Sequence, residues 1–283
     1  MKAGIAVLLL ILGACALAPA YARLVAGGDP FRTHVLDTVD GAAVVAEAGG
    51  GLGTTPIGPG WRGAYLLGAD ALGRDVAARL LYGGRTSLMV AAGATALCLL
   101  LGVAAGVVSG VGGGWVDAGV SGLVDLVWAF PVFLLAISLS VVLRGEETGP
   151  WLPALVLGVV FTPYVARPVR SALLVLRDGP LVEAARAVGG SVPHVVWRHM
   201  LPQLLPLLLG LAPVVAAMML LTEAALSVLG LGVTAPGVSW GTLIADGVGL
   251  LHQRPAVAVA PGVMLSATVL ALNAVGEGLR AAG

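Results

Sequence analysis

Six apolar stretches dominate this sequence and restrict the fold that it can adopt. They cover approximately residues 3–21, 87–109, 120–142, 152–165, 204–226 and 256–275. A helix that crosses the hydrocarbon core of a bilayer needs about 20 mostly apolar residues. With 58% hydrophobic and only 11% charged residues, the chain is too apolar for a water-soluble domain. We therefore predict an all-α, polytopic membrane helical bundle with six transmembrane helices.

The first stretch has a second possible interpretation, and the fourth is shorter than a typical membrane span. Lys2, the apolar run and the segment Ala18–Ala22 also resemble a cleavable signal peptide, and Leu12–Cys15 resembles a lipoprotein cleavage box. Because five further stretches follow, an uncleaved first span is the simpler account. The fourth stretch is short, and we expect Arg167 and Arg170 beyond it to extend their side chains to the interface.

The long polar segment at residues 24–86 is predicted to be an extracytoplasmic loop. Its first half is rich in glycine and proline, but Leu72, Val76 and Leu80 near its end recur at helical spacing. This spacing predicts a short amphipathic helix lying on the membrane surface. The predicted organisation is an N-terminal transmembrane helix at 1–23, this loop, and a core of five transmembrane helices at 87–283.

A second polar segment, at residues 167–202, separates the fourth and fifth stretches. One apolar stripe follows the helical pattern i, i+3, i+4, i+7 and consists of Leu181, Ala184, Ala185 and Val188. Glu183 and Arg186 lie off that stripe and are predicted to pair. Gly189-Gly190 ends the helix, and Ser191 is placed to cap a second one. Small alanines on a narrow stripe suit close approach by a partner protein, although the spacing alone equally allows an amphipathic connector on the lipid surface.

Two acidic residues, Asp125 and Glu223, lie within the apolar stretches. Ionisable groups at membrane depth are costly and usually face a cavity or a partner. Asp125 is therefore a candidate for lining a translocation path or pairing with another subunit, or else it lies near the inner interface. Glu223 is a candidate for the same pathway or packing roles and is expected near the outer surface.

Glycines and prolines mark helix contacts and bends within the apolar stretches. Gly102, Gly106 and Gly110 repeat every four residues, a pattern that allows another helix to approach closely. Four prolines, each able to kink its helix, fall in the third to sixth stretches: Pro131, Pro163, Pro213 and Pro261.

Charge and lysine content exclude two classes of function. The formal net charge is zero, which gives no indication of a nucleic-acid partner. Lys2 is the single lysine of the chain and is not part of a Gly-Lys-Ser/Thr sequence. A phosphate-binding P-loop needs that lysine, so the chain is not expected to be an ATPase.

Other short motifs do not indicate a catalytic or metal site. Gly237–Gly241 matches G-x-S-x-G, but a nucleophile elbow needs a preceding strand that is not predicted here. His194 and His199 are five residues apart, whereas a helical metal pair is four apart. Cys15 and Cys98 lie in apolar runs and are predicted to be buried thiols. We expect no cofactor, no metal and no catalytic residue.

Four stretches together resemble the inner-membrane permeases of ABC importers, in the dipeptide, oligopeptide and nickel branch. They are Glu183-Ala184-Ala185 with Gly189 and Leu201-Pro202, Gly68–Asp75, Glu223–Gly241 and Gly276–Arg280. The resemblance covers about residues 65–282 and does not extend to residues 24–64. The sequence departs from the family pattern at Ala69, where the family has threonine, at His199, where the general pattern has isoleucine, and at Glu277, where the family has aspartate.

The resemblance implies an ATP-driven importer of peptides, or of a related small solute such as nickel, in a bacterial or archaeal inner membrane. It implies both termini inside, a second homologous permease subunit in a heterodimer, two ATP-binding cassette subunits that hydrolyse ATP, and an extracytoplasmic solute-binding protein. By analogy, a cytoplasmic coupling helix would contact the ATPase through Glu183, Ala184, Ala185, Gly189, Leu201 and Pro202. A stand-alone secondary transporter or channel is the alternative.

Overall fold

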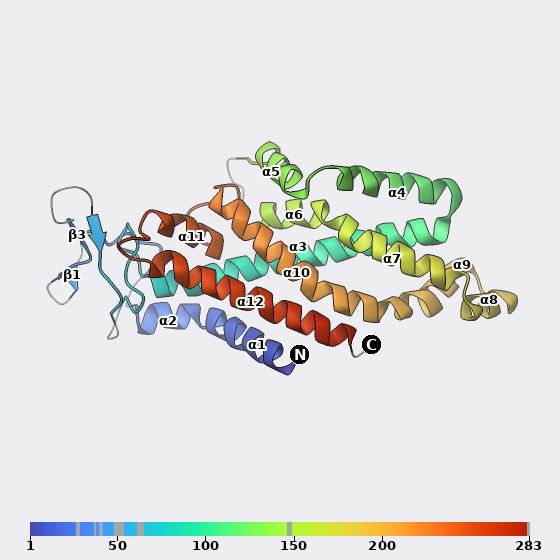
Figure 1. The fold of residues 1–283 in the computed structure, drawn as a ribbon, viewed down its shortest axis with the longest axis horizontal. Helices are drawn as coiled ribbons and strands as arrows, with labels where there is room; N and C mark the ends of the chain where they lie inside the picture. Colours follow the sequence, from blue (N-terminus) through green and yellow to red (C-terminus); the bar gives the residue numbers. More distant parts are fainter. Residues whose placement is uncertain are drawn as a thin grey trace.

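A bundle of long helices forms the body of the protein, and it carries small β-hairpins at one end (Figure 1). The computed structural model describes residues 1–26, 29–36, 38–39, 42–47, 54–60, 65–145 and 149–281. Within these ranges, four helical segments are long and apolar enough to cross a membrane, and two bent helix pairs raise this number to six if each pair is one span. The predicted all-α membrane bundle is confirmed.

The element bounds are as follows. The helices are α1 (Lys2–Ala16), α2 (Ala18–Leu24), α3 (Val76–Gly112), α4 (Gly114–Ala129), α5 (Val132–Val142), α6 (Trp151–Val160), α7 (Thr162–Arg177), α8 (Pro180–Ala187), α9 (Val192–Val195), a π-helix (Val196–Met200), a 3-10 helix (Leu201–Leu204), α10 (Leu205–Val228), α11 (Trp240–Val248) and α12 (Ala256–Arg280). The strands are β1 (Thr38–Val39), β2 (Ala42–Ala43), β3 (Val45–Glu47) and β4 (Thr54–Pro56), paired as the antiparallel hairpins β1–β2 and β3–β4.

The third span, predicted as one helix at residues 120–142, is broken. α4 and α5 meet at an angle of 91°. The break falls at Phe130-Pro131, where Phe130 has an extended backbone with φ −88° and ψ 142°. Proline disfavours a helical conformation of the residue before it and offers no N–H of its own, which explains the break. The other three prolines lie in the first turn of α7 (Pro163) or inside continuous helices (Pro213, Pro261).

The fourth span is longer than the predicted residues 152–165. α6 and α7 together form one apolar helical segment, Trp151–Arg177. The two arginines that end the apolar run, Arg167 and Arg170, are themselves helical and form ion pairs with carboxylates of α4. These carboxylates compensate the charge of both arginines, and the extension of their side chains to the interface stays a prediction.

The surface helix predicted near residues 72–80 does not exist as a separate element in the described part of the loop. Val76 and Leu80 belong instead to the first turns of α3, where they are buried. Asp75 starts this helix, since its Oδ1 accepts a hydrogen bond of 2.8 Å from the Ala78 amide. Val76 and Leu80 follow the predicted helical spacing and pack on protein, whereas Leu72 lies in a turn before the helix and is 42% exposed.

Glycines allow α3 and α7 to lie against each other. A Cβ atom at Gly102 would lie 2.5 Å from a side-chain atom of Val165, and one at Gly106 would lie 2.7 Å from Val169. Gly110 meets Leu173 in the same way, at 2.8 Å. The repeat of four along α3 matches the repeat of four along α7, so the predicted close helix contact is confirmed.

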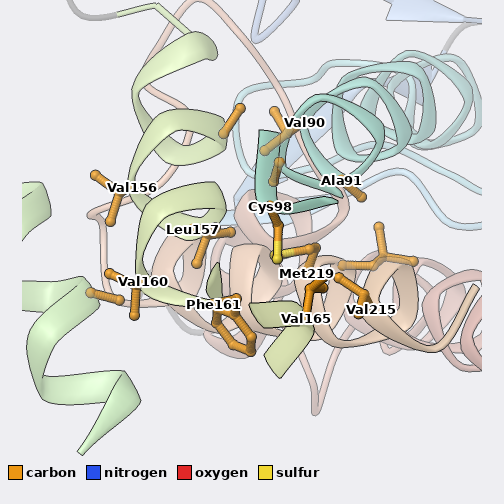
Figure 2. Close-up of a cluster of buried hydrophobic side chains, with 14 of the residues drawn as sticks. Val90, Ala91, Cys98, Val156, Leu157, Val160, Phe161, Val165, Val215 and Met219 are labelled. Carbon is orange, nitrogen blue, oxygen red and sulfur yellow. The ribbon is translucent and has the colours of Figure 1, made fainter. Parts of the chain in front are cut away.

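The apolar core continues from α3 to α6 and α10. Figure 2 shows Cys98 of α3 beside Met219 of α10, with Leu157 and Phe161 from the α6 side. Both cysteines, Cys15 and Cys98, are buried and free, as predicted.

The two ends of the bundle differ. The hairpins lie at one end, whereas α8 and α9 protrude at the other (Figure 1). α1 runs beside α12, and a Cβ atom at Gly278 would lie 2.6 Å from the side chain of Met1. The beginning of α1 and the end of α12 are therefore neighbours, and both point away from the hairpin end.

Candidate functional site

The connection between α7 and α10 consists of α8, a glycine elbow and a second helical segment. Its inner side is formed by Val182, Val195 and Met200, which are buried and belong to the main apolar core. Its outer side is the predicted stripe, on which Leu181 is 51% and Val188 is 87% exposed. The helix is attached to the core by Val182, and Ala185 at the edge of the stripe also packs against the core. The rest of the stripe, Leu181, Ala184 and Val188, is exposed.

The elbow fixes the angle between the two parts of this connection. Gly189 has φ +85°, a left-handed conformation that side chains other than glycine rarely adopt. The amide of Gly189 donates to the Arg186 carbonyl at 2.9 Å, and that of Gly190 donates to the Ala185 carbonyl at 3.0 Å. Ser191 occupies the next N-cap position, but its side chain makes no capping hydrogen bond. The elbow is confirmed, and it depends on glycine.

An open hollow of about 680 Å³ lies along the stripe and the elbow. Of the six residues that the resemblance assigned to ATPase contact, Ala184, Ala185 and Gly189 line it. Glu183 is exposed beside it. Leu201 and Pro202 lie instead in the 3-10 helix that leads into α10, where Leu201 packs against the core.

Two features of this connection differ from the sequence reasoning. Glu183 forms no ion pair with Arg186 within the described part of the chain. The π-helix at Val196–Met200 brings the rings of His194 and His199 to a centroid distance of 6.0 Å, although their spacing of five residues did not indicate proximity. Among the residues that the structure describes, no three or more metal-binding side chains form a group.

Asp125 lies at the edge of a slot between α4 and the α3–α7 pair. The slot has a volume of about 400 Å³. Asp125 is 61% exposed and accepts a hydrogen bond of 2.6 Å from Nη2 of Arg167, whose guanidinium also lies 4.6 Å from the ring centroid of Trp128. No residue of α4 is buried, so polar contacts account for much of its attachment.

A second ion pair, which sequence reasoning missed, holds the start of α4. Arg170 donates from Nε and Nη2 to the two carboxylate oxygens of Asp117, each at 2.6 Å. Ser109 and Ser121 donate to the same carboxylate. The only sequence signal was the presence of one acidic residue ahead of the third stretch and one arginine beyond the fourth.

Glu223 is completely buried where α10 meets α3 and α11. Its Oε2 accepts from the Ser87 hydroxyl at 3.0 Å, and its Oε1 accepts from the Ser227 hydroxyl at 2.7 Å. Ser239, the centre of the G-x-S-x-G sequence, donates to Ser227 and forms the capping box of α11. Glu223 thus joins three helices inside the protein, and the role of Ser239 is structural.

A cluster of charged side chains lies at the N-terminal end of α3. Asp70 accepts from Arg74 Nε at 2.7 Å and from Arg79 Nη1, and both Asp70 and Arg79 are buried. Arg79 also lies 3.2 Å from Asp246 of α11. The Gly68–Asp75 motif therefore folds against the N-terminal end of α3. No residue near Asp246 in the sequence predicted that it takes part in this cluster.

These features define a multi-pass helical membrane protein with a protruding helical connection between α7 and α10. The family model described as "Binding-protein-dependent transport system inner membrane component" matches residues 102–282. This chain belongs to that family.

Relatives agree with the assignment. A Brucella ovis protein named as a peptide permease is 37% identical over 224 residues, which are 78% of this chain and 72% of the relative. A Sinorhizobium fredii protein named as a peptide ABC transporter permease is 40% identical over 216 residues, covering 76% and 72%. A chain of the inward-facing MetNI methionine ABC transporter shares the fold, with a TM-score of 0.60, 23% identity and coverage of 72% of this chain and 95% of that chain.

Proposed function

We propose that this chain is a permease subunit of an ATP-driven importer of peptides, or of a related small solute such as nickel. A binding protein outside a bacterial inner membrane would deliver the solute. The chain would supply part of the pathway beside a second, homologous permease subunit in a heterodimer. The names of the Brucella ovis and Sinorhizobium fredii relatives support peptides as the solute class.

Coupling to a separate ATPase is proposed to occur through α8. The observation that carries this proposal is the exposed apolar stripe along α8 and the hollow beside it. Exposed apolar faces mark sites that contact a partner protein or a membrane, and our proposal assigns this face to a partner protein. Two ATP-binding cassette subunits, one for each permease subunit, would hydrolyse ATP and move the two bundles between outward-open and inward-open states.

The proposed orientation places α8, α9 and both termini in the cytoplasm and the hairpins outside. The support is their arrangement at opposite ends of the bundle and the contact between Met1 and Gly278 (Figure 1). In this orientation the ATPase and the binding protein approach the bundle from opposite ends. We further propose that Asp125 faces the translocation path and that Glu223 has a packing role.

A matched pair of substitutions on α8 tests the coupling proposal. Ala184 and Ala187 are exposed alanines of the same helix, but only Ala184 lines the hollow. Ala184→Asp places a carboxylate without a cation in the proposed interface, at a cost of about 2–3 kcal/mol, or roughly 30- to 150-fold in affinity. We expect ATPase retention during co-purification and ATP-dependent uptake to fall accordingly, whereas Ala187→Asp should retain most of both.

The contradicting result is equally specific. Uptake that survives Ala184→Asp, in preparations that retain no ATPase, would refute coupling through α8. It would favour a stand-alone transporter, because transport would then need no energy from a partner chain.

A further inference from the structure

We propose that the slot between α4 and the α3–α7 pair binds a small zwitterion, such as a short peptide with free termini. Its carboxylate would bind the arginines of α7, and its ammonium group would bind Asp125. This proposal deepens the proposed transport function and rests on it. It depends on the charge, the free hydrogen-bonding groups and the size of the slot.

First, charged side chains are exposed within the candidate membrane spans that form the slot. The side chains of Asp125 and Arg167 are 61% and 43% exposed, although they belong to helices within the membrane-spanning segments. Ionisable groups there face water, a partner or a ligand, because contact with lipid tails is costly. Both side chains line the slot, so the slot is a polar space rather than a gap for lipid.

The second argument is charge balance. Asp117 compensates Arg170 through two hydrogen bonds, and Asp125 compensates Arg167 through one. The four groups have a net charge of zero. A bound anion or cation would leave one charge of the slot without a partner, whereas a zwitterion would not. The slot therefore favours a ligand that carries both signs.

The third argument is the supply of unused hydrogen-bonding groups. The Asp117 carboxylate already accepts hydrogen bonds from Arg170, Ser109 and Ser121. Three other slot residues, as the structure describes them, have free groups. Asp125 Oδ2 accepts no hydrogen bond, Arg167 donates only through Nη2, and the Ser171 hydroxyl has no partner. A guanidinium binds a carboxylate through two parallel N–H groups, and a free carboxylate oxygen accepts from an ammonium group.

Size and rigidity agree with a small ligand. The volume of about 400 Å³ lies within the range of roughly 300–1,000 Å³ typical of small-molecule sites. Arg167 is held from two sides, by Asp125 and by the ring of Trp128. The Trp128 ring in turn lies against the Tyr164 ring, tilted by 57° at a centroid distance of 4.6 Å. The arginine is thus positioned before a ligand arrives, which reduces the entropy lost on binding.

Protection of an introduced thiol tests the proposal on the purified full-length chain. Ser171→Cys places a thiol in the slot, while both native cysteines are buried. For a dissociation constant of about 1 mM, about 10 mM dialanine should slow maleimide labelling roughly ten-fold. N-acetyl-dialaninamide, which lacks both charges, should give no protection, and neither should dialanine in Asp125→Asn or Arg167→Gln backgrounds.

Val175→Cys is the control, because Val175 is an exposed residue of the same helix outside the slot. Its labelling should not respond to dialanine. Equal protection by the blocked peptide, protection by neither, or a Ser171→Cys thiol that does not react at all would each overturn the proposal. The assay needs no ATPase, so its failure is distinguishable from loss of coupling in the Ala184→Asp experiment.

Discussion

The contact between α3 and α7 yields a prediction whose magnitude follows from the structure. Gly106→Ala adds a methyl group that would lie 2.7 Å from Val169 Cγ1 and 2.8 Å from the carbonyl oxygen of Ala166. Carbon atoms prefer separations of at least about 3.5 Å, so the two helices must move apart by roughly 0.8 Å. The backbone oxygen prevents relief by side-chain rotation alone.

The free-energy cost of this separation is similar to the cost of overpacking a protein core. A gap of that width forfeits about a quarter to a half of each neighbouring dispersion contact, and overpacking typically costs about 1–3 kcal/mol. Alanine also gains up to about 1 kcal/mol over glycine in helix propensity, which must be removed from the comparison.

Gly93→Ala supplies the matched control. Gly93 lies in the same helix, and a Cβ atom there would meet only the side chain of Ala154, at an ordinary distance of 3.6 Å. The propensity gain is common to both variants, so Gly106→Ala should be less stable than Gly93→Ala by about 1–3 kcal/mol.

The assay is reversible unfolding of the purified protein by sodium dodecyl sulfate in dodecyl maltoside, followed by circular dichroism. Equal stability of the two variants, or a more stable Gly106→Ala, would refute the reasoning. It would mean that the spacing of α3 and α7 is not set by the small glycine surface.

Two further substitutions test buried polar groups by the same assay. Arg79→Met should lower the free energy of unfolding by about 2–3 kcal/mol, somewhat less than the usual cost of breaking a buried ion pair, because Arg74 still contacts Asp70. A double variant that also carries Asp70→Leu should recover part of this loss. No recovery would contradict the explanation that Arg79→Met leaves the Asp70 charge uncompensated. Glu223→Ala should lower the free energy of unfolding by about 2–5 kcal/mol, because it leaves a cavity and unpartnered hydroxyl groups. Glu223→Gln should lower it by less than half of that. Equal losses for the two variants would show that the hydrogen bonds to residue 223 do not contribute to stability.

Local sequence patterns predicted one part of the candidate site, whereas the other part depends on contacts between residues far apart in the sequence. The elbow at Gly189-Gly190 and the stripe of α8 were readable, because glycine conformations and helical spacing are properties of a few consecutive residues. The pairs of Asp125 with Arg167 and of Asp117 with Arg170 were not, since the partners are 42 and 53 positions apart. Several alternative partners were compatible with the same sequence.

The sequence by itself determined that the protein resides in a membrane, and it determined the number of candidate spans, the glycine contact face of α3 and the stripe and elbow of the connection between α7 and α10. Each of these follows from composition or from short-range periodicity, which act within a single helix. Only the tertiary structure decided that the third span breaks at Pro131, that the first turns of α3 are buried and that Glu223 faces hydroxyl groups. The physical reason is that burial and pairing of a polar group depend on which helix lies opposite, and that arrangement is a property of the whole bundle.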